Sequence, residues 1–127
     1  MTLFRLASLA LCLIVVSGCG YTDVAPVTGT VTLDGAPLIG ASITFQPDNG
    51  RPSYGGTDQY GNYKLFYSME QNGAVIGPCT VTISTATEDD SGKRRKEMIP
   101  KKYFDKEKIK VSVEAKANRI DLKLTTK

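Results

Sequence analysis

The chain has 127 residues, a formal net charge of +3, no histidine and no tryptophan. Histidine is the usual proton carrier near neutral pH and the commonest transition-metal ligand, so its absence argues against zinc enzymes and against Ser-His-Asp or Cys-His hydrolases. A net charge this small is no indication of nucleic-acid binding. The composition therefore argues against histidine-dependent enzymes, and we expect a protein that is not an enzyme and holds no cofactor or metal.

The first residues have the layout of a secretory signal peptide. One positive charge, Arg5, precedes an unbroken run of apolar and small residues over 6–16. That run of about 11 residues is well short of the roughly 20 that a membrane-spanning helix needs. Small residues follow it, and the sequence predicts that residues 1–18 are removed on export.

The stretch Val16-Ser17-Gly18-Cys19 resembles the lipobox of bacterial lipoproteins, with Val16 in the place where leucine is commonest. The resemblance implies diacylglycerol on the Cys19 thiol, cleavage before Cys19 and acylation of the new amine. It thus implies an exported protein held to a membrane by lipid, a location in which nucleic acid is a poor partner. Gly20, which is not aspartate, favours the outer membrane over the inner one. The alternative is an ordinary secreted protein with an incidental cysteine.

After this signal, residues 19–26 are predicted to be a short lipidated tether, and residues 27–127 a single domain. In that domain Cys79 has no cysteine partner, so we expect no internal disulfide and a fold stabilised by its apolar core. Cys79 shares parity with Val81 and Ile83 and should point inward as an inert core residue. An intermolecular disulfide is the alternative.

Period-two alternation of apolar and polar residues predicts an all-β domain. Residues 27–33 and 41–46 are expected to form a hairpin around Asp34-Gly35. The connection 68–77 shows poor periodicity, and 87–100 is too polar for core and should be a long loop. About seven short strands at close spacing favour an antiparallel sandwich; the remaining ones are 54–57, 62–66, 79–84, 109–114 and 120–125.

Several blocks are similar to carboxypeptidase regulatory-like domains: Val27–Val31 with Asp34–Ala41, then Thr57–Tyr63, Gly77–Ile83 and Ile99–Tyr103. Cys79 departs from that pattern, which usually has an aromatic residue there. The resemblance implies a prealbumin-like Greek-key β-sandwich and does not imply peptidase activity, because fold does not carry function. A related hydrolase of 5-hydroxyisourate relies on histidines and a C-terminal Tyr-Arg-Gly-Ser, both of which this chain lacks.

The turn residues of these blocks have structural explanations. Gly35 and Gly61 can adopt positive φ, and Asp34 belongs to the first turn. Asp58 can accept backbone N–H bonds across its turn; an exposed binding tip at Asp58 and Gly61 is the alternative. Gly29 allows a neighbouring strand to approach closely or marks a bulge.

A basic stretch is the main candidate site, and its members are Lys93, Arg94, Arg95, Lys96, Lys101 and Lys102. It is either a solvated, mobile loop or an anion-binding patch for lipid head groups or acidic polysaccharide. Loop acids at Asp48, Asp58 and 88–90 match no calcium-loop spacing and are expected to be solvated.

The sequence as a whole favours a non-enzymatic envelope lipoprotein that acts as a structural or interaction module. Its expected partners are a membrane, through lipid on Cys19, and an envelope protein or polysaccharide. The alternative is a binding module for glycan or an anionic envelope surface, through the basic 93–110 loop and the Tyr54 and Tyr60 turns. The sequence does not determine the oligomeric state.

Overall fold

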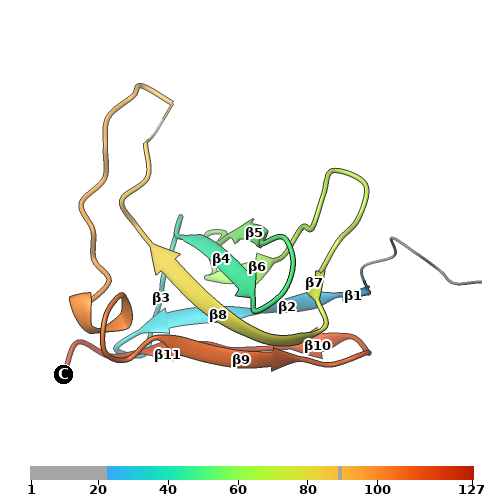
Figure 1. Ribbon diagram of the computed structural model, residues 1–127. Coiled ribbons are helices and arrows are strands. Elements are labelled where there is room, and N and C mark those ends of the chain that lie inside the picture. Colours follow the sequence, from blue (N-terminus) through green and yellow to red (C-terminus); the bar gives the residue numbers. More distant parts are fainter. Residues whose placement is uncertain (1–22, 89) are drawn as a thin grey trace, which may run out of the picture.

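A computed structural model describes residues 23–88 and 90–127, and within them it contains eleven strands and one 3₁₀ turn, η1 (Lys101–Tyr103) (Figure 1). The fold is all-β and sandwich-like, which confirms the fold class predicted from the alternation. In this part of the chain no helix has the length and apolarity to cross a membrane. The predicted signal peptide and Cys19 lie outside the described residues.

One layer is a fully antiparallel four-stranded sheet. Its strand order is β5 (Ser53–Gly56), β4 (Ser42–Pro47), β8 (Gly77–Ser84) and β9 (Ile109–Val113). The long central strands pair over six positions, from Ser42 opposite Ser84 to Pro47 opposite Cys79. β5 and β9 are therefore the edges of this sheet.

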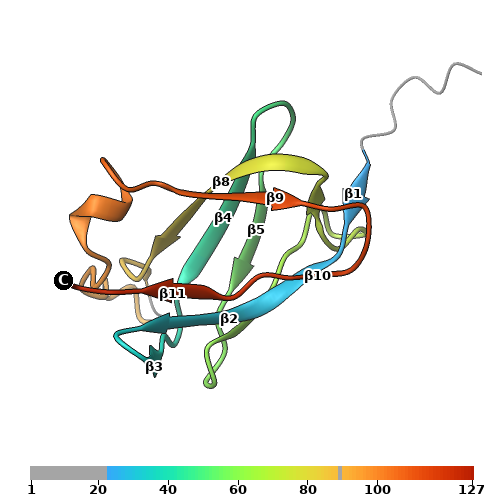
Figure 2. The ribbon, with the colours of Figure 1, turned by 90° about the horizontal axis from the view of Figure 1, so that it is seen from below.

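The other layer is built around β2 (Val27–Leu33) (Figure 2). On one side of it lie the short antiparallel strands β3 (Ala36–Pro37) and β6 (Asn62–Lys64). On its other side the C-terminal segment pairs in two pieces, β10 (Asn118–Arg119) and β11 (Leu122–Leu124), both parallel to β2.

The core between the layers follows the predicted parity. Apolar side chains alternate inward on every long strand, and Val31, Ile43, Phe45 and Leu65 are completely buried. Phe45 of β4 and Tyr63 of β6 meet across the layers with ring centroids 6.3 Å apart. Cys79 is buried among these residues, as its parity predicts, and burial raises the pKa of its thiol.

The predicted hairpin between residues 27–33 and 41–46 is wrong, because these strands lie in different sheets. The Asp34-Gly35 turn does form, with positive φ at both residues, but it returns the chain only through the two residues of β3. The chain then passes through Gly40, at φ 68°, into β4 of the opposite layer. The Asp-Gly sequence predicts the turn, but it does not predict to which sheet the following strand belongs.

The predicted last strand, 120–125, is interrupted, and its pairing is parallel where an antiparallel sandwich was expected. Ile120 N donates to Thr28 O, but its carbonyl oxygen then turns towards Gly29, where an added Cβ would lie 2.0 Å from it. The Tyr63 hydroxyl donates to this same carbonyl. Asp121 Oδ1 accepts Thr30 N at 3.0 Å, in place of a backbone partner.

The N-terminal end of the described chain is also paired. Strand β1 (Val24–Ala25) lies within the range that the sequence assigned to the tether, and it pairs antiparallel with β7 (Ala74–Val75). Ala25 is buried, and Ile76 N donates to Asp23 O. The connection 68–77 therefore contains the partner strand of the chain's entry into the domain.

Gly29→Ala should destabilise the domain, because its new methyl group would meet the Ile120 carbonyl and no flexible side chain could yield. Such overpacking typically costs about 1–3 kcal/mol. Gly56→Ala is the matched control, since the nearest atom to its added Cβ is 3.5 Å away and its φ is not positive. Urea denaturation should show a loss for Gly29→Ala and almost none for Gly56→Ala. Equal midpoints for the two variants would contradict the close approach.

Candidate functional site: the basic arm and the aromatic patch

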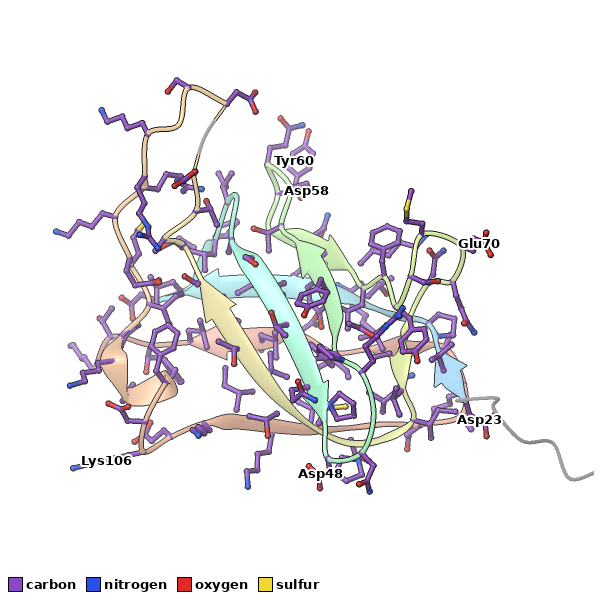
Figure 3. The ribbon with its side chains drawn as sticks, turned by 45° about the horizontal axis from the view of Figure 1, so that its top comes forward. Asp23, Asp48, Asp58, Tyr60, Glu70 and Lys106 are labelled. Carbon is purple, nitrogen blue, oxygen red and sulfur yellow. The ribbon has the colours of Figure 1, made fainter. Side chains whose placement is uncertain are left out.

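The polar segment that follows β8 leaves the sheet and returns as a long projecting loop, residues 85–100, hereafter the arm. Figure 1 shows it rising away from the two layers, and Figure 3 shows its side chains directed outward near its tip. Bridge pairing of Glu88 with Arg94 brings its two sides together. Residues 93–96 all lie on the returning side and are exposed.

The base of the arm is clamped by a polar cluster around Glu97. Its carboxylate accepts bonds from the Ser84 hydroxyl, from Thr85 N at 2.9 Å and from Ile99 N at 3.1 Å. Thr85 is completely buried, and its hydroxyl donates to the Lys96 carbonyl and accepts from Met98 N. Ile99 is buried in the core, so the expectation that 87–100 is too polar for core is wrong at this position.

The electrostatics of this clamp favour an ionised Glu97. Partial burial opposes ionisation, but the hydrogen bonds from Ser84, Thr85 and Ile99 outweigh it and hold the pKa of Glu97 below its ordinary value of 4.5. The arm is therefore joined to β8 by a charged acceptor as well as by the chain itself.

Arg95 is used inside the molecule. Its guanidinium donates to the carbonyls of Gly40 at 2.9 Å and Ile39 at 3.1 Å, and its backbone N donates to Thr87 O. A side chain at position 40 would collide with it, because an added Cβ would lie 2.3 Å from Arg95 Nη1. Arg95 thus joins the arm to the loop before β4.

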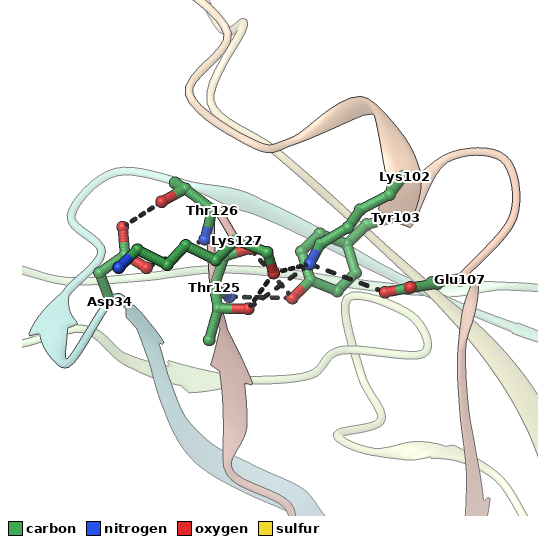
Figure 4. A network of polar contacts seen from close by, with 7 residues as sticks. All are labelled: Asp34, Lys102, Tyr103, Glu107, Thr125, Thr126 and Lys127. Carbon is green, nitrogen blue, oxygen red and sulfur yellow. Dashed lines mark hydrogen bonds and ion pairs between the residues drawn. The ribbon is translucent and has the colours of Figure 1, made fainter.

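Lys102 likewise has internal partners (Figure 4). Its ammonium donates to Lys127 O at 2.7 Å and lies 3.7 Å from the Glu107 carboxylate, so η1 is held against the C-terminal residues. Tyr103 strengthens the same contact, because its hydroxyl accepts Thr125 N at 2.9 Å. Lys101 is exposed and lies 3.9 Å from the Asp105 carboxylate.

The predicted anion-binding residues therefore separate into two groups. Lys101 and Lys102 belong to the 3₁₀ turn, whereas the cluster 93–96 borders an open groove of about 1060 Å³ between the arm and the end of β2. The groove holds acids as well as bases; it is lined by Leu33, Asp34, Lys93, Arg94, Arg95, Lys96, Glu97, Met98 and Thr126. Arg94 and Lys96 are the exposed cations that remain most suitable for an external anion.

Within the part of the chain that the structure describes, the loop acids do not gather into a cluster; Asp89 lies outside that part. Asp58 Oδ1 accepts the N–H groups of Tyr60 and Asn62, each at 2.9 Å, and Gly61 has φ 79°, so this acid closes its own turn. Asp34 accepts Thr126 N and the Thr126 hydroxyl, and these bonds hold the pKa of Asp34 below its usual range. Among the described residues no three Cys, Asp or Glu side chains gather where they could hold a metal ion.

A second exposed feature was foreseen from the sequence only at Tyr54, and we call it the aromatic patch: Tyr54, Phe66, Tyr67 and Met69. Tyr54 N and Phe66 N each bond to the other's carbonyl, and the four side chains with Ser68 border a shallow pocket of about 450 Å³. Tyr63 and Leu65 point inward, so the alternation already placed Phe66 outside. Tyr60, at the tip of the Asp58 turn, is exposed but separate (Figure 3).

The comparisons with known proteins do not identify a family. No protein-family model matches the chain, and no curated protein is significantly similar to it. A solved DUF3823 family protein from Parabacteroides merdae is 12% identical with a TM-score of 0.48, covering 81% of this chain and 46% of that one. A 9R-lipoxygenase from Cyanothece is 17% identical with a TM-score of 0.40, covering 80% of this chain and 16% of that one. The chain thus spans less than half the length of either structure.

The clamp at Glu97 makes the stability of the domain depend on pH. A carboxylate whose pKa is lowered by folding contributes stability above its ordinary value of 4.5, and that contribution is lost as the pH falls through the lower, folded value. Glu97→Gln should lower the free energy of unfolding at pH 7 by about 1 kcal/mol, allowing for solvent screening of a partly exposed group.

The difference between Glu97→Gln and wild type should shrink below about pH 4.5 in urea denaturation at a series of pH values. Glu70→Gln, in an exposed loop, is the control and should follow wild type throughout. A Glu97→Gln deficit that is the same at pH 3 and pH 7 would show that the charge plays no part.

Proposed function

We propose that this protein is an exported, lipid-anchored envelope protein whose sandwich domain acts as a structural or interaction module and not as an enzyme. The observation that carries the proposal is the order of features in residues 1–19: charge, short apolar run, small residues and Cys19. The domain then begins at once, with β1 at Val24.

The sandwich supports a role without catalysis. The turns at Asp34-Gly35 and Asp58–Gly61 belong to the blocks that resemble carboxypeptidase regulatory-like domains, and their acids bond to the chain: Asp58 to Tyr60 N and Asn62 N, and Asp34 to Thr126. The acids with lowered pKa, Asp34, Glu97 and Asp121, accept bonds from the chain that they stabilise. Perturbed groups of this kind are accounted for by structure, so they give no reason to assign them catalysis.

Cys19→Ala should abolish lipid attachment and leave an unprocessed or soluble protein, because only the thiol can take the diacylglycerol. Cys12→Ala is the matched control, since Cys12 lies inside the predicted signal and is removed with it. Mass spectrometry of the native protein should find the lipid on Cys19 in wild type and in Cys12→Ala. An unmodified Cys19 in the native protein would refute the anchor.

A second candidate function is favoured by the exposed cations of the arm. Arg94 and Lys96 project into the open groove from a segment that extends away from both sheets. An anionic glycan or envelope surface could meet them there without disturbing the core. Asp34 and Glu97 on the same groove oppose such binding, so the expected affinity is low.

The double variant Arg94→Ser/Lys96→Ser should weaken binding to a soluble acidic polysaccharide such as polygalacturonate. Exposed ion pairs contribute about 0.2–1 kcal/mol each, so the loss for two of them should be at most roughly 30-fold and should fade as salt approaches 0.15 M. The melting temperature should be unchanged, whereas Arg95→Ser should lower it because of the bonds to Ile39 and Gly40.

Lys116→Ser/Lys123→Ser removes the same charge from other exposed positions and serves as the control for this measurement. Equal weakening by both double variants would indicate an effect of net charge alone. If wild type does not bind at low salt, the arm is a solvated loop and not an anion-binding site.

A further inference from the structure

The aromatic patch exposes several large apolar side chains at one place on the surface. Met69 is fully exposed, and Tyr54 and Phe66 are 56% and 48% exposed. They lie together over the paired positions 54 and 66, so the exposure is contiguous and not scattered. Contiguous exposed apolar groups of this kind mark a surface that meets a partner or a membrane.

Basic side chains border the same rings. The Arg51 guanidinium carbon lies 4.6 Å from the centre of the Tyr67 ring, and its Nη2 donates to Tyr67 O at 2.6 Å. Lys64 Nζ lies 5.9 Å from the centre of the Phe66 ring. One acid, Glu70, is on the adjoining loop. Aromatic rings with flanking Arg and Lys have the chemistry of side chains that occupy the interface between lipid head groups and water.

The patch also lies at the end of the domain where the chain enters. The loop that carries Met69 leads directly into β7, which pairs with β1, and Gly73 packs against the carbonyl of Ala25. Figures 1 and 2 both show this loop and the incoming chain at the same end of the sandwich. From Cys19 to Val24 the chain can reach at most about 17 Å, at roughly 3.5 Å per residue. A lipid on Cys19 would therefore hold this end of the domain close to the bilayer.

We propose that the aromatic patch docks on the membrane that carries the lipid anchor, with Phe66 and Met69 among the head groups and Arg51 and Lys64 against lipid phosphates. The inference rests on the proposed lipid anchor. Because the tether makes docking intramolecular, a weak contact is sufficient to orient the domain. The arm follows the opposite end of β8, so it lies at the other end of the sandwich from the patch (Figure 1).

The absence of tryptophan gives a direct test of this orientation. In the mature chain, Cys19 is coupled to a maleimide-headgroup lipid in vesicles of phosphatidylethanolamine and phosphatidylglycerol; Cys79 is buried and should not compete. Phe66→Trp then places a single tryptophan in the patch. We expect its emission to shift to shorter wavelength on the vesicles and to be quenched by brominated acyl chains.

The matched reporter is Lys106→Trp, at an exposed position on the far side of the domain (Figure 3), and its emission should stay that of a tryptophan in water. Adding Met69→Glu to Phe66→Trp should abolish the shift and the quenching. Equal quenching of both reporters, or of neither, would overturn the proposal. The proposal would also be overturned if the emission of Phe66→Trp did not change on vesicles but changed with added glycan oligomers, because the patch would then bind sugar.

The coupling chemistry supplies the tether, so the result does not depend on whether the cell lipidates Cys19. Failure of the anchor is read separately, from the mass of the native protein. A lipidated protein whose two reporters behave alike would refute the docking and leave the anchor intact.

Discussion

The contact between Gly29 and Ile120 determines how the two ends of the domain are joined. Glycine at position 29 leaves room for the Ile120 carbonyl, which the Tyr63 hydroxyl then satisfies. Because this detour interrupts the backbone ladder, the Asp121 carboxylate takes over the N–H of Thr30. A buried carbonyl without a donor would be costly, and burial raises the pKa of Tyr63, which keeps this donor protonated. The C-terminal strands can therefore lie parallel to β2 although their pairing is broken.

The C-terminal residues also hold η1 and the turn at Asp34 in place. Lys102 and Tyr103 of η1 contact Thr125 and Lys127, and Asp34 contacts Thr126 (Figure 4). The arm is held at its other side by Glu97 and Arg95. A segment that is rich in charge is thus anchored at defined points, and much of that charge serves the anchoring. The basic composition of 93–110 overstates the charge that an external ligand could meet.

The two exposed surfaces of the domain differ in chemistry and in place. The groove beside the arm carries charges of both signs, whereas the aromatic patch is apolar with a basic border. The patch adjoins the β1–β7 pair at the entry of the chain, and the arm projects from the end of β8. The two surfaces therefore lie at different ends of the sandwich (Figure 1).

The sequence by itself determined the longer strands, the side of each that is buried and the turns at Asp34-Gly35 and Asp58–Gly61. Alternation predicted the inward positions of Val31, Ile43 and Cys79, and turn chemistry predicted the positive φ of Gly35 and Gly61, because both effects act over a few neighbouring residues. Only the tertiary structure decided which strands pair. Alternation identifies which face of a strand is buried, but it does not identify which other strand pairs with it. The separation of β2 from β4 and the parallel pairing of β11 with β2 therefore had no local signal.

The same limit applies to the candidate sites. The composition of residues 93–96 located the cations in the sequence. Arg95, however, donates to the carbonyls of Ile39 and Gly40, which are 56 and 55 positions away. Tyr54 and Phe66 become neighbours only when their strands pair. Such contacts depend on which distant segments the packed core brings together, and a local pattern carries no information about them.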